Sequence, residues 1–130
     1  MTDEELLAHA AEAAEGSYSP YSHFRVGAAI VTDDGLIITG ANVENAAFGA
    51  SICAEANAIT SAIAGGATSI STVAVVCLDG EPCTPCGNCR QIMREFGVER
   101  VILQTPDGAT HPVSLEDLLP MSFGPEALDG

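Results

Sequence analysis

The spacing of hydrophobic positions along the chain switches between a helical period and the period of β-strands, and it predicts an α/β protein. Thr2, followed three residues later by Glu5, forms a capping box at the start of the first helical stretch. Turn residues separate the successive elements. In chain order we expect helix 3–15, strand 24–32, strand 36–41, helix 52–64, strand 71–78, helix 87–97, strand 99–105 and helix 114–119.

The order of these strands predicts a mixed sheet. Asp33, Asp34 and Gly35 lie between the first two strands and indicate an antiparallel hairpin. The stretch 71–78 is apolar almost without interruption, as is typical of a strand buried on both faces. A helix and then another apolar strand follow it, and this order predicts a parallel crossover. We therefore expect one sheet between helical layers, in a single domain over residues 1–130.

Length and composition agree with one globular domain. The chain has 130 residues, of which 47% are hydrophobic, and this is enough for one packed core. We find neither a signal-peptide pattern nor an apolar run of about 18 residues, so we expect a cytoplasmic protein without a membrane span. Five cysteines without a disulfide framework indicate reduced thiols that serve metal binding or catalysis.

The net charge is strongly negative. Eighteen Asp and Glu residues stand against four arginines and no lysine, and the formal charge is −14. Binding to a phosphate backbone depends on clustered Lys and Arg side chains. The composition therefore argues against a nucleic-acid polymer as a ligand.

Three cysteines lie near the starts of predicted helices. Cys86 and Cys89 are three residues apart, so a helix would place both sulfurs on one face, and Cys53 lies at the start of helix 52–64. A C-x-x-C pair alone fits a redox dithiol, half of a structural zinc site, or two ligands of a catalytic zinc. A thioredoxin-type pair is expected earlier, at the first helix of a βαβ unit. Three thiolates with one open position are typical of a catalytic zinc, and helix N-termini favour thiolates.

The remaining candidate ligands have simpler interpretations. Cys77 lies inside an apolar strand, and we expect it to be a buried structural cysteine. Cys83 is interpreted as a loop residue. His9, His23 and His111 lie in an amphipathic helix, in a turn and beside a proline, so we expect them to be solvated.

Glu55 lies two residues after Cys53. Without the cysteines it would be interpreted as an exposed helical glutamate. Beside a zinc that activates water, a carboxylate that does not bind the metal can accept a proton from the water and deliver it to the leaving group. The combination with the three cysteines therefore makes Glu55 a candidate catalytic residue.

The motifs around these residues resemble those of a known family. "CAE" at residues 53–55 and "PCGNC" at residues 85–89 match the pattern of zinc-dependent deaminases. Together with "YSPYSHFRVGAA", "GANVENAAFGAS" and "LLPMSF", they make the chain similar to the small, homotetrameric cytidine deaminases over nearly all its length. This resemblance implies a three-layer α/β/α fold with a mixed central sheet of about five strands.

The resemblance also implies roles for individual residues. Glu55 would be the proton shuttle, beside one Zn²⁺ per subunit held by Cys53, Cys86 and Cys89. Asn42 and Glu44 would hold the ribose hydroxyls, Phe24 would lie beside the nucleoside, and the backbone around Ala54 would contact the base. Ala46, Phe48 and Phe123 match positions that reach the active site of a neighbouring subunit. As an alternative, Phe24 and Phe48 are ordinary core aromatics.

Two positions depart from the family pattern. Many relatives carry arginine directly after the catalytic glutamate, where this chain has Ala56. The charge of the sulfurs would then be compensated differently, by Arg90 or by the helix N-termini. Phe48 stands where tyrosine is common in relatives, and it lacks the tyrosine hydroxyl.

The activity implied by the resemblance is the zinc-dependent hydrolytic deamination of cytidine and 2′-deoxycytidine to uridine and 2′-deoxyuridine, with release of ammonia. The acidic surface favours a free nucleoside over a nucleotide. Two alternatives stay open. One is another zinc aminohydrolase of the same superfamily, such as a blasticidin S deaminase, and the other is a non-catalytic module with a closed four-ligand zinc site.

The acidity itself has two explanations, solubility alone or adaptation to a cytoplasm rich in salt. In the second case salt screens the repulsion among carboxylates. Measuring the melting temperature at increasing KCl concentrations distinguishes these two explanations. A melting temperature that rises with KCl supports adaptation to salt, whereas an unchanged melting temperature contradicts it.

Overall fold

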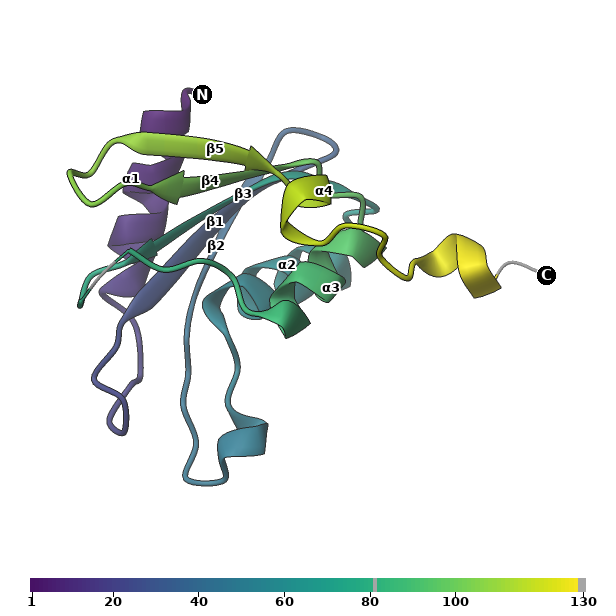
Figure 1. The fold of residues 1–130 in the computed structure, drawn as a ribbon. Coiled ribbons are helices and arrows are strands. Elements are labelled where there is room, and N and C mark those ends of the chain that lie inside the picture. The colour runs from purple at the N-terminus through teal and green to yellow at the C-terminus, as the bar shows by residue number, and fades with distance from the viewer. Residues whose placement is uncertain (81, 129–130) are drawn as a thin grey trace.

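A mixed sheet of five strands forms the centre of the fold in the computed structural model, which describes residues 1–80 and 82–128. Its strand order is β2-β1-β3-β4-β5 (Figure 1). The apolar strand predicted around residues 71–78 is the central one. The strands are β1 (Val26–Thr32), β2 (Ile37–Ala41), β3 (Ile70–Cys77), β4 (Arg100–Gln104) and β5 (Thr110–Ser114).

The strand directions agree with the prediction. β1 pairs with β2 in antiparallel register through Ala29 and Thr39, and it also pairs antiparallel with β3. β3 and β4 are parallel, with Ala74 opposite Ile102, so the crossover is confirmed. The helix of the crossover carries Cys86 and Cys89 at its beginning.

Helices cover both faces of the sheet and give the three expected layers. α1 (Asp3–Ala14) packs on one face, and α2 (Ala54–Ala64) and α3 (Gly87–Glu95) pack on the other, as Figure 1 shows. Successive residues of β1 point to opposite layers, because Ala29 packs with the α1 cluster while its two neighbours pack with α2. A short helix, α4 (Leu115–Leu118), follows β5.

Local capping follows the sequence pattern. The Thr2 hydroxyl accepts a hydrogen bond from the Glu5 amide at the start of α1, at 3.1 Å. The Ser114 hydroxyl accepts from the Asp117 amide at the start of α4, also at 3.1 Å. These contacts explain why both helix starts could be predicted from sequence.

The pattern of apolar residues missed one strand and two short 3₁₀ segments. β5 was not predicted because its sequence, Thr-His-Pro-Val-Ser, contains a proline and little apolar character. It is an edge strand, where Pro112 is tolerated because one side of the strand has no neighbour. The 3₁₀ turns span Phe48–Ala50 and Pro125–Leu128, where we had expected irregular chain.

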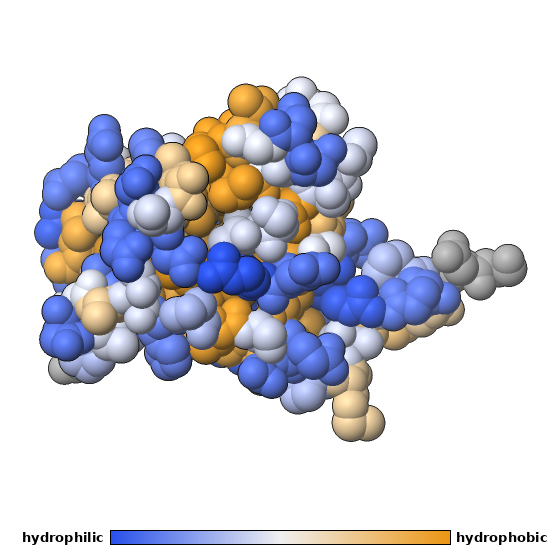
Figure 2. All heavy atoms as spheres, turned by 90° about the horizontal axis from the view of Figure 1, so that it is seen from above, coloured by the Kyte–Doolittle hydropathy of each residue, from blue (hydrophilic) through white to orange (hydrophobic). Residues whose placement is uncertain are grey.

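The C-terminal segment, defined here as residues 119–128, projects from the body of the molecule. Both Figure 1 and Figure 2, which are related by a 90° turn, show this projection. Three large apolar side chains on it are exposed, Met121, Phe123 and Leu128. Among the described residues, no helix combines the length and the apolar character needed to cross a membrane.

Close packing between α2 and β2 depends on Gly40. A Cβ atom added there would lie 2.7 Å from the backbone nitrogen of Ala58 and 2.8 Å from the carbonyl oxygen of Ala54. We predict that Gly40→Ala lowers the free energy of unfolding by about 1–3 kcal/mol, because helix α2 must move. Urea unfolding measures the change. Gly49→Ala is the control, since nothing lies within 4 Å of its added Cβ, and equal stability of the two variants would contradict the prediction.

Candidate metal centre and active site

Three cysteine sulfurs converge where two helices begin. Cys53 is the N-cap of α2, Cys86 is the N-cap of α3, and Cys89 lies in the first turn of α3. The three Sγ atoms all lie within 4.8 Å of one another, and those of Cys53 and Cys86 are 3.9 Å apart. The tertiary structure therefore brings together the three cysteines that the sequence singled out.

The chemistry of these sulfurs fits a zinc ion. Neither N-cap cysteine makes a side-chain capping hydrogen bond, so the free amides and positive ends of both helices are available to stabilise thiolates. A hydrogen bond with the Cys89 thiol lowers the pKa of Cys53 to about 6. The same hydrogen bond raises the pKa of Cys89. The group found among the described residues has three members, so a tetrahedral ion there would keep one open position.

Glu55 is buried beside the sulfurs, with a relative exposure of 4%. Burial is the main cause that raises the pKa of this carboxyl, to about 7, and the charge of Cys53 adds to the effect. A carboxyl group with this pKa can both accept and donate a proton near neutral pH. The interpretation as an exposed helical glutamate is therefore wrong.

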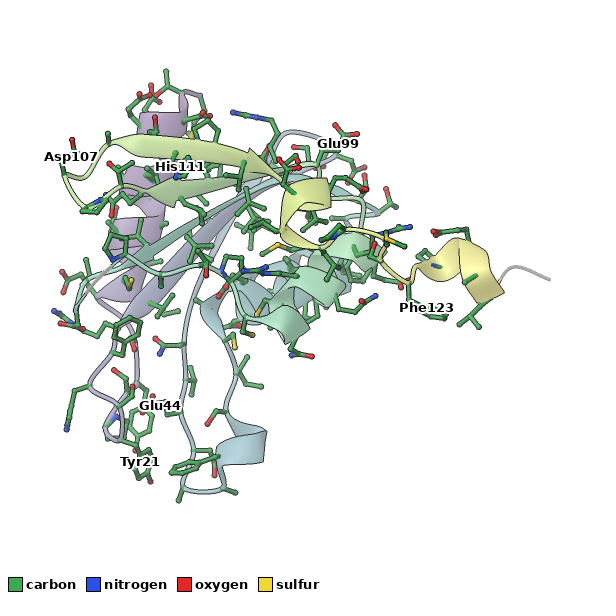
Figure 3. All side chains as sticks on the ribbon, viewed as in Figure 1. Tyr21, Glu44, Glu99, Asp107, His111 and Phe123 are labelled. Atoms are coloured by element: carbon green, nitrogen blue, oxygen red, sulfur yellow. The ribbon has the colours of Figure 1, made fainter. Side chains whose placement is uncertain are left out.

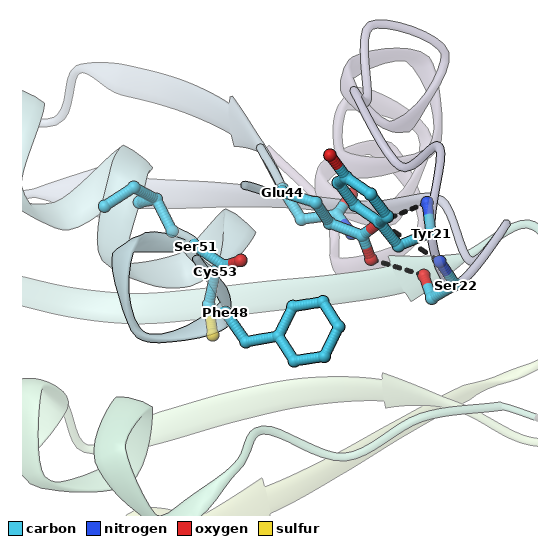
Figure 4. Close-up of a pocket in the computed structure, with 8 residues that line it drawn as sticks. Tyr21, Ser22, Glu44, Phe48, Ser51 and Cys53 are labelled. Atoms are coloured by element: carbon cyan, nitrogen blue, oxygen red, sulfur yellow. Dashed lines mark hydrogen bonds between the residues drawn. The ribbon is translucent and has the colours of Figure 1, made fainter. Parts of the chain in front are cut away.

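Two adjoining cavities extend from the sulfurs. The smaller one, about 170 Å³, is lined by Cys53, Cys86 and Glu55 among others, and the larger one, about 420 Å³, is the pocket shown in Figure 4. Asn42 and Cys53 line both cavities, so the two form one site. The smaller cavity is also lined by Phe24, Val26, Ala54, Glu55, Cys83, Thr84 and Cys86, and the larger one by Tyr21, Ser22, Glu44, Phe48, Ser51 and Ile52.

Asn42 is held firmly at the junction of the cavities. Its Oδ1 atom accepts hydrogen bonds from the Val26 amide, at 2.9 Å, and from the Ser17 hydroxyl. Its Nδ2 atom donates to the carbonyl oxygen of Phe24, also at 2.9 Å. The amide group of asparagine carries two N–H donors. The hydrogen bonds among residues 1–80 and 82–128 use one of these donors, which leaves the second N–H of Asn42 for a ligand.

Glu44 receives three hydrogen bonds from one loop, as the dashed lines in Figure 4 show. Its Oε1 atom accepts from the amides of Tyr21 and Ser22, at 3.0 Å and 3.1 Å, and its Oε2 atom accepts from the Ser22 hydroxyl. The Ser22 hydroxyl is the main cause that holds the pKa of Glu44 below its usual value. The site thus contains an ionised acceptor at some distance from the sulfurs.

The two candidate aromatics do not behave as core residues. Phe48 is 75% exposed and meets the ring of Tyr21 edge to face, with centroids 6.0 Å apart. Phe24 is partly buried and lines the smaller cavity. Ala54 is fully buried and lines the same cavity, whereas Ala46 is exposed in the loop that carries Phe48.

Phe123 does not reach the site of its own chain. It is 61% exposed on the C-terminal segment, and Figure 3 shows it far from Tyr21 and Glu44. Its place is compatible with a contact to another molecule, which is the role implied by the resemblance.

Six residues that line the two cavities were not singled out by sequence reasoning, namely Tyr21, Ser22, Val26, Ser51, Ile52 and Thr84. A signal existed for four of them, because Tyr21, Ser22 and Val26 belong to the quoted motif "YSPYSHFRVGAA" and Ser51 ends the quoted motif "GANVENAAFGAS". No periodic or compositional signal marks the other two.

The other thiols and the histidines lie mostly as expected. Cys83 is a loop residue that lines the smaller cavity, and its pKa is raised by burial and by a hydrogen bond with Cys77. Cys77 is at the end of β3 and is only partly buried, because its strand ends there. His9, His23 and His111 are exposed.

Arg90 makes its described hydrogen bonds with backbone carbonyls. Its Nε atom donates to Pro85 at 2.8 Å and its Nη1 atom donates to Leu118 at 2.7 Å. The loop before Cys86 is thereby held in place. Of the two expected sources of charge compensation, the helix N-termini are the ones that meet the sulfurs directly.

Comparisons with known proteins match the chain to cytidine deaminases and to a deaminase zinc-binding region. Residues 1–105 match the family described as the cytidine and deoxycytidylate deaminase zinc-binding region. The cytidine deaminase of Halalkalibacterium halodurans is 39% identical, over 99% of this chain and 99% of its own. The crystal structure of cytidine deaminase from Burkholderia pseudomallei matches with a TM-score of 0.87 at 44% identity, over 95% of this chain and 100% of that chain. The crystal structure of cytidine deaminase from Mycobacterium tuberculosis matches with a TM-score of 0.83 at 39% identity, over 95% of this chain and 98% of that chain.

Burial of Glu55 has a measurable consequence for stability without metal. The folded state keeps the Glu55 proton up to about pH 7, while the usual pKa is 4.5, so the unfolded state loses the proton first. We predict that, as the pH rises from 4.5 to 7, metal-free protein loses up to about 3 kcal/mol of unfolding free energy relative to Glu55→Gln.

Urea unfolding of chelator-treated protein across this pH range measures the difference. Glu12→Gln, on the exposed side of α1, is the matched control and should follow the wild type. Parallel pH curves for wild type and Glu55→Gln would show that the carboxyl is not buried as described.

Proposed function

The chain belongs to the cytidine and deoxycytidylate deaminase family, and from this premise we propose that it hydrolyses cytidine and 2′-deoxycytidine to uridine and 2′-deoxyuridine. The observation that carries the proposal is the buried Glu55 next to three converging sulfurs. The named relatives that match over almost the whole chain are cytidine deaminases. This supports the nucleoside substrate over another aminohydrolase activity.

One zinc ion per subunit, held by Cys53, Cys86 and Cys89, would supply the Lewis acidity that makes water nucleophilic near neutral pH. Glu55 accepts a proton from the water that attacks C4 of the base. It gives this proton to N3, then accepts the second proton from the new hydroxyl group on C4 and gives it to the departing amino group. A C–O bond forms, the C4–N bond breaks, and ammonia leaves. The raised pKa of Glu55 suits a group that must both take and give a proton.

The cavity walls support specific contacts with the nucleoside. Asn42 and Glu44 hold the ribose hydroxyls, the former through its spare N–H and the latter as an ionised acceptor. Phe24 lies beside the nucleoside, and the backbone of Ala54 contacts the base near Glu55. A 5′-phosphate would meet the charge of Glu44 and a chain with net charge −14. The proposed substrate is therefore the free nucleoside.

We further propose a homotetramer with shared active sites. Phe123 is exposed and remote from the cavity of its own chain, so it would pack on the pyrimidine of a neighbouring subunit. Ala46 and Phe48 lie in an exposed loop from which they would reach the same kind of contact. The projecting segment carries three exposed large apolar side chains, Met121, Phe123 and Leu128, and such a group supports an interaction site there.

The proposed setting is pyrimidine salvage in the cytoplasm, by a single domain of residues 1–130. Five cysteines, an odd number without a spaced disulfide framework, support a reducing compartment. Two apolar clusters on the faces of one sheet support a single domain.

Turnover by a Glu55→Ala variant tests this function. We predict that kcat for cytidine falls roughly 10²- to 10⁴-fold, because the proton carrier is lost, while one zinc per chain remains bound. The decrease in ultraviolet absorbance measures deamination, and elemental analysis measures zinc. Glu12→Ala is the control, because this glutamate is exposed on α1.

The same assay separates the alternatives. Wild-type protein should lose turnover with a zinc chelator and regain it with added zinc. Absence of cytidine turnover in zinc-loaded wild type would refute the proposal, and turnover of blasticidin S instead would identify the other aminohydrolase activity.

A further inference from the structure

The outer side of helix α3 is joined to the C-terminal segment by side-chain hydrogen bonds. Gln91 donates from Nε2 to the carbonyl oxygen of Phe123, at 2.8 Å. Arg94 donates from Nε to the Ser122 hydroxyl, at 2.9 Å, and its Nη2 atom forms an ion pair with Glu126. These contacts lie on both sides of Phe123 in the chain and hold its backbone.

Gly124 shows how closely the segment passes Arg94. A Cβ atom added to Gly124 would lie 2.4 Å from Cζ and Nη2 of Arg94. Such a distance is impossible without moving the guanidinium away from its partners. The present place of the Arg94 guanidinium therefore depends on glycine at this position.

Half of the arginines of the chain hold its C-terminal part. The chain has only four cationic side chains against 18 acidic ones. Two of them, Arg90 and Arg94, bind residues of α4 or of the C-terminal segment. Chain ends are ordinarily poorly ordered unless other groups hold them. Holding this end of the chain costs conformational entropy. Burial of the Phe123 side chain within its own subunit offsets little of this cost, because Phe123 is 61% exposed.

We propose that Gln91 and Arg94 are positioning residues for Phe123. They hold the C-terminal segment on α3 so that the Phe123 ring stands away from its own subunit, oriented to cover the nucleoside in a neighbouring one. This inference rests on the proposed function, to which it adds the residues that control the contact between subunits. Helix α3 then serves two sites, because its N-terminus carries Cys86 and Cys89 of one site while its outer side presents the ring to another.

Kinetics of Arg94→Ala test the inference. Loss of an ordered aromatic contact should raise KM for cytidine roughly two- to tenfold, with a smaller change in kcat. Gly124→Ala should have the same effect, since it displaces the guanidinium without removing its charge. Arg100→Ala is the matched control, because it removes an arginine ion pair with Asp3, 2.8 Å long, away from the segment. Unchanged KM in both Arg94→Ala and Gly124→Ala would overturn the inference.

Mixed oligomers show whether Arg94 acts on a neighbouring site. Arg94→Ala chains are co-expressed with Glu55→Ala chains, each with its own tag, and oligomers that carry both tags are purified. The sites that keep Glu55 then belong to Arg94→Ala chains and can receive an intact segment from a Glu55→Ala neighbour. We expect a fraction of sites with wild-type KM. If all sites keep the raised KM, the segment acts within its own subunit and the inference is wrong.

Hydrogen exchange gives a measure that does not depend on turnover. The Ala127 amide, which donates to the carbonyl oxygen of Gly124 at 3.0 Å, should exchange faster in Arg94→Ala than in Arg100→Ala, and equal exchange would overturn the positioning role. Cytidine turnover by the wild type tests the proposed function separately. Failure of the function and failure of this inference therefore give different results.

Discussion

The convergence of two helix N-termini on one face of the sheet is the constraint on which the rest of the site depends. α2 and α3 begin next to each other, and their first residues supply three sulfurs within 4.8 Å. Three thiolates at such a distance repel one another strongly unless positive charge lies close. The N-terminal ends of the two helices supply part of this positive charge, and a bound divalent ion would supply the rest. A strand, helix, strand crossover is what places α3 there.

Two carboxylates of the site have opposite environments, and this difference separates their roles. Glu55 is buried with a raised pKa near 7, whereas Glu44 accepts three hydrogen bonds and has a lowered pKa. One can carry a proton, and the other remains an anionic acceptor. The loop with Tyr21 and Ser22 provides the second environment, so its backbone amides matter as much as the charged residue. Such a division of roles is suited to a reaction that moves protons at one end of a bound polar molecule.

The few arginines of this acidic chain connect segments that are distant in sequence. Arg25 pairs with Asp79, Arg100 pairs with Asp3, and Arg90 and Arg94 hold the residues that follow β5. Among the described residues that line the two cavities, none is an arginine. Positive charge therefore serves tertiary structure here, and the cavities present polar and acidic groups. This distribution agrees with a neutral ligand.

The sequence by itself determined the α-helices, four of the five strands and the single sheet, and it singled out the three candidate ligand cysteines, because apolar spacing and short cysteine motifs are local signals. β5 escaped prediction, since an edge strand with Pro112 needs little apolar character and is defined by its pairing with β4. Only the tertiary structure decided that Glu55 is buried, that Ser22 holds Glu44, and that the C-terminal segment lies on α3. Burial and contacts across the chain depend on where distant segments meet, and no local pattern encodes that.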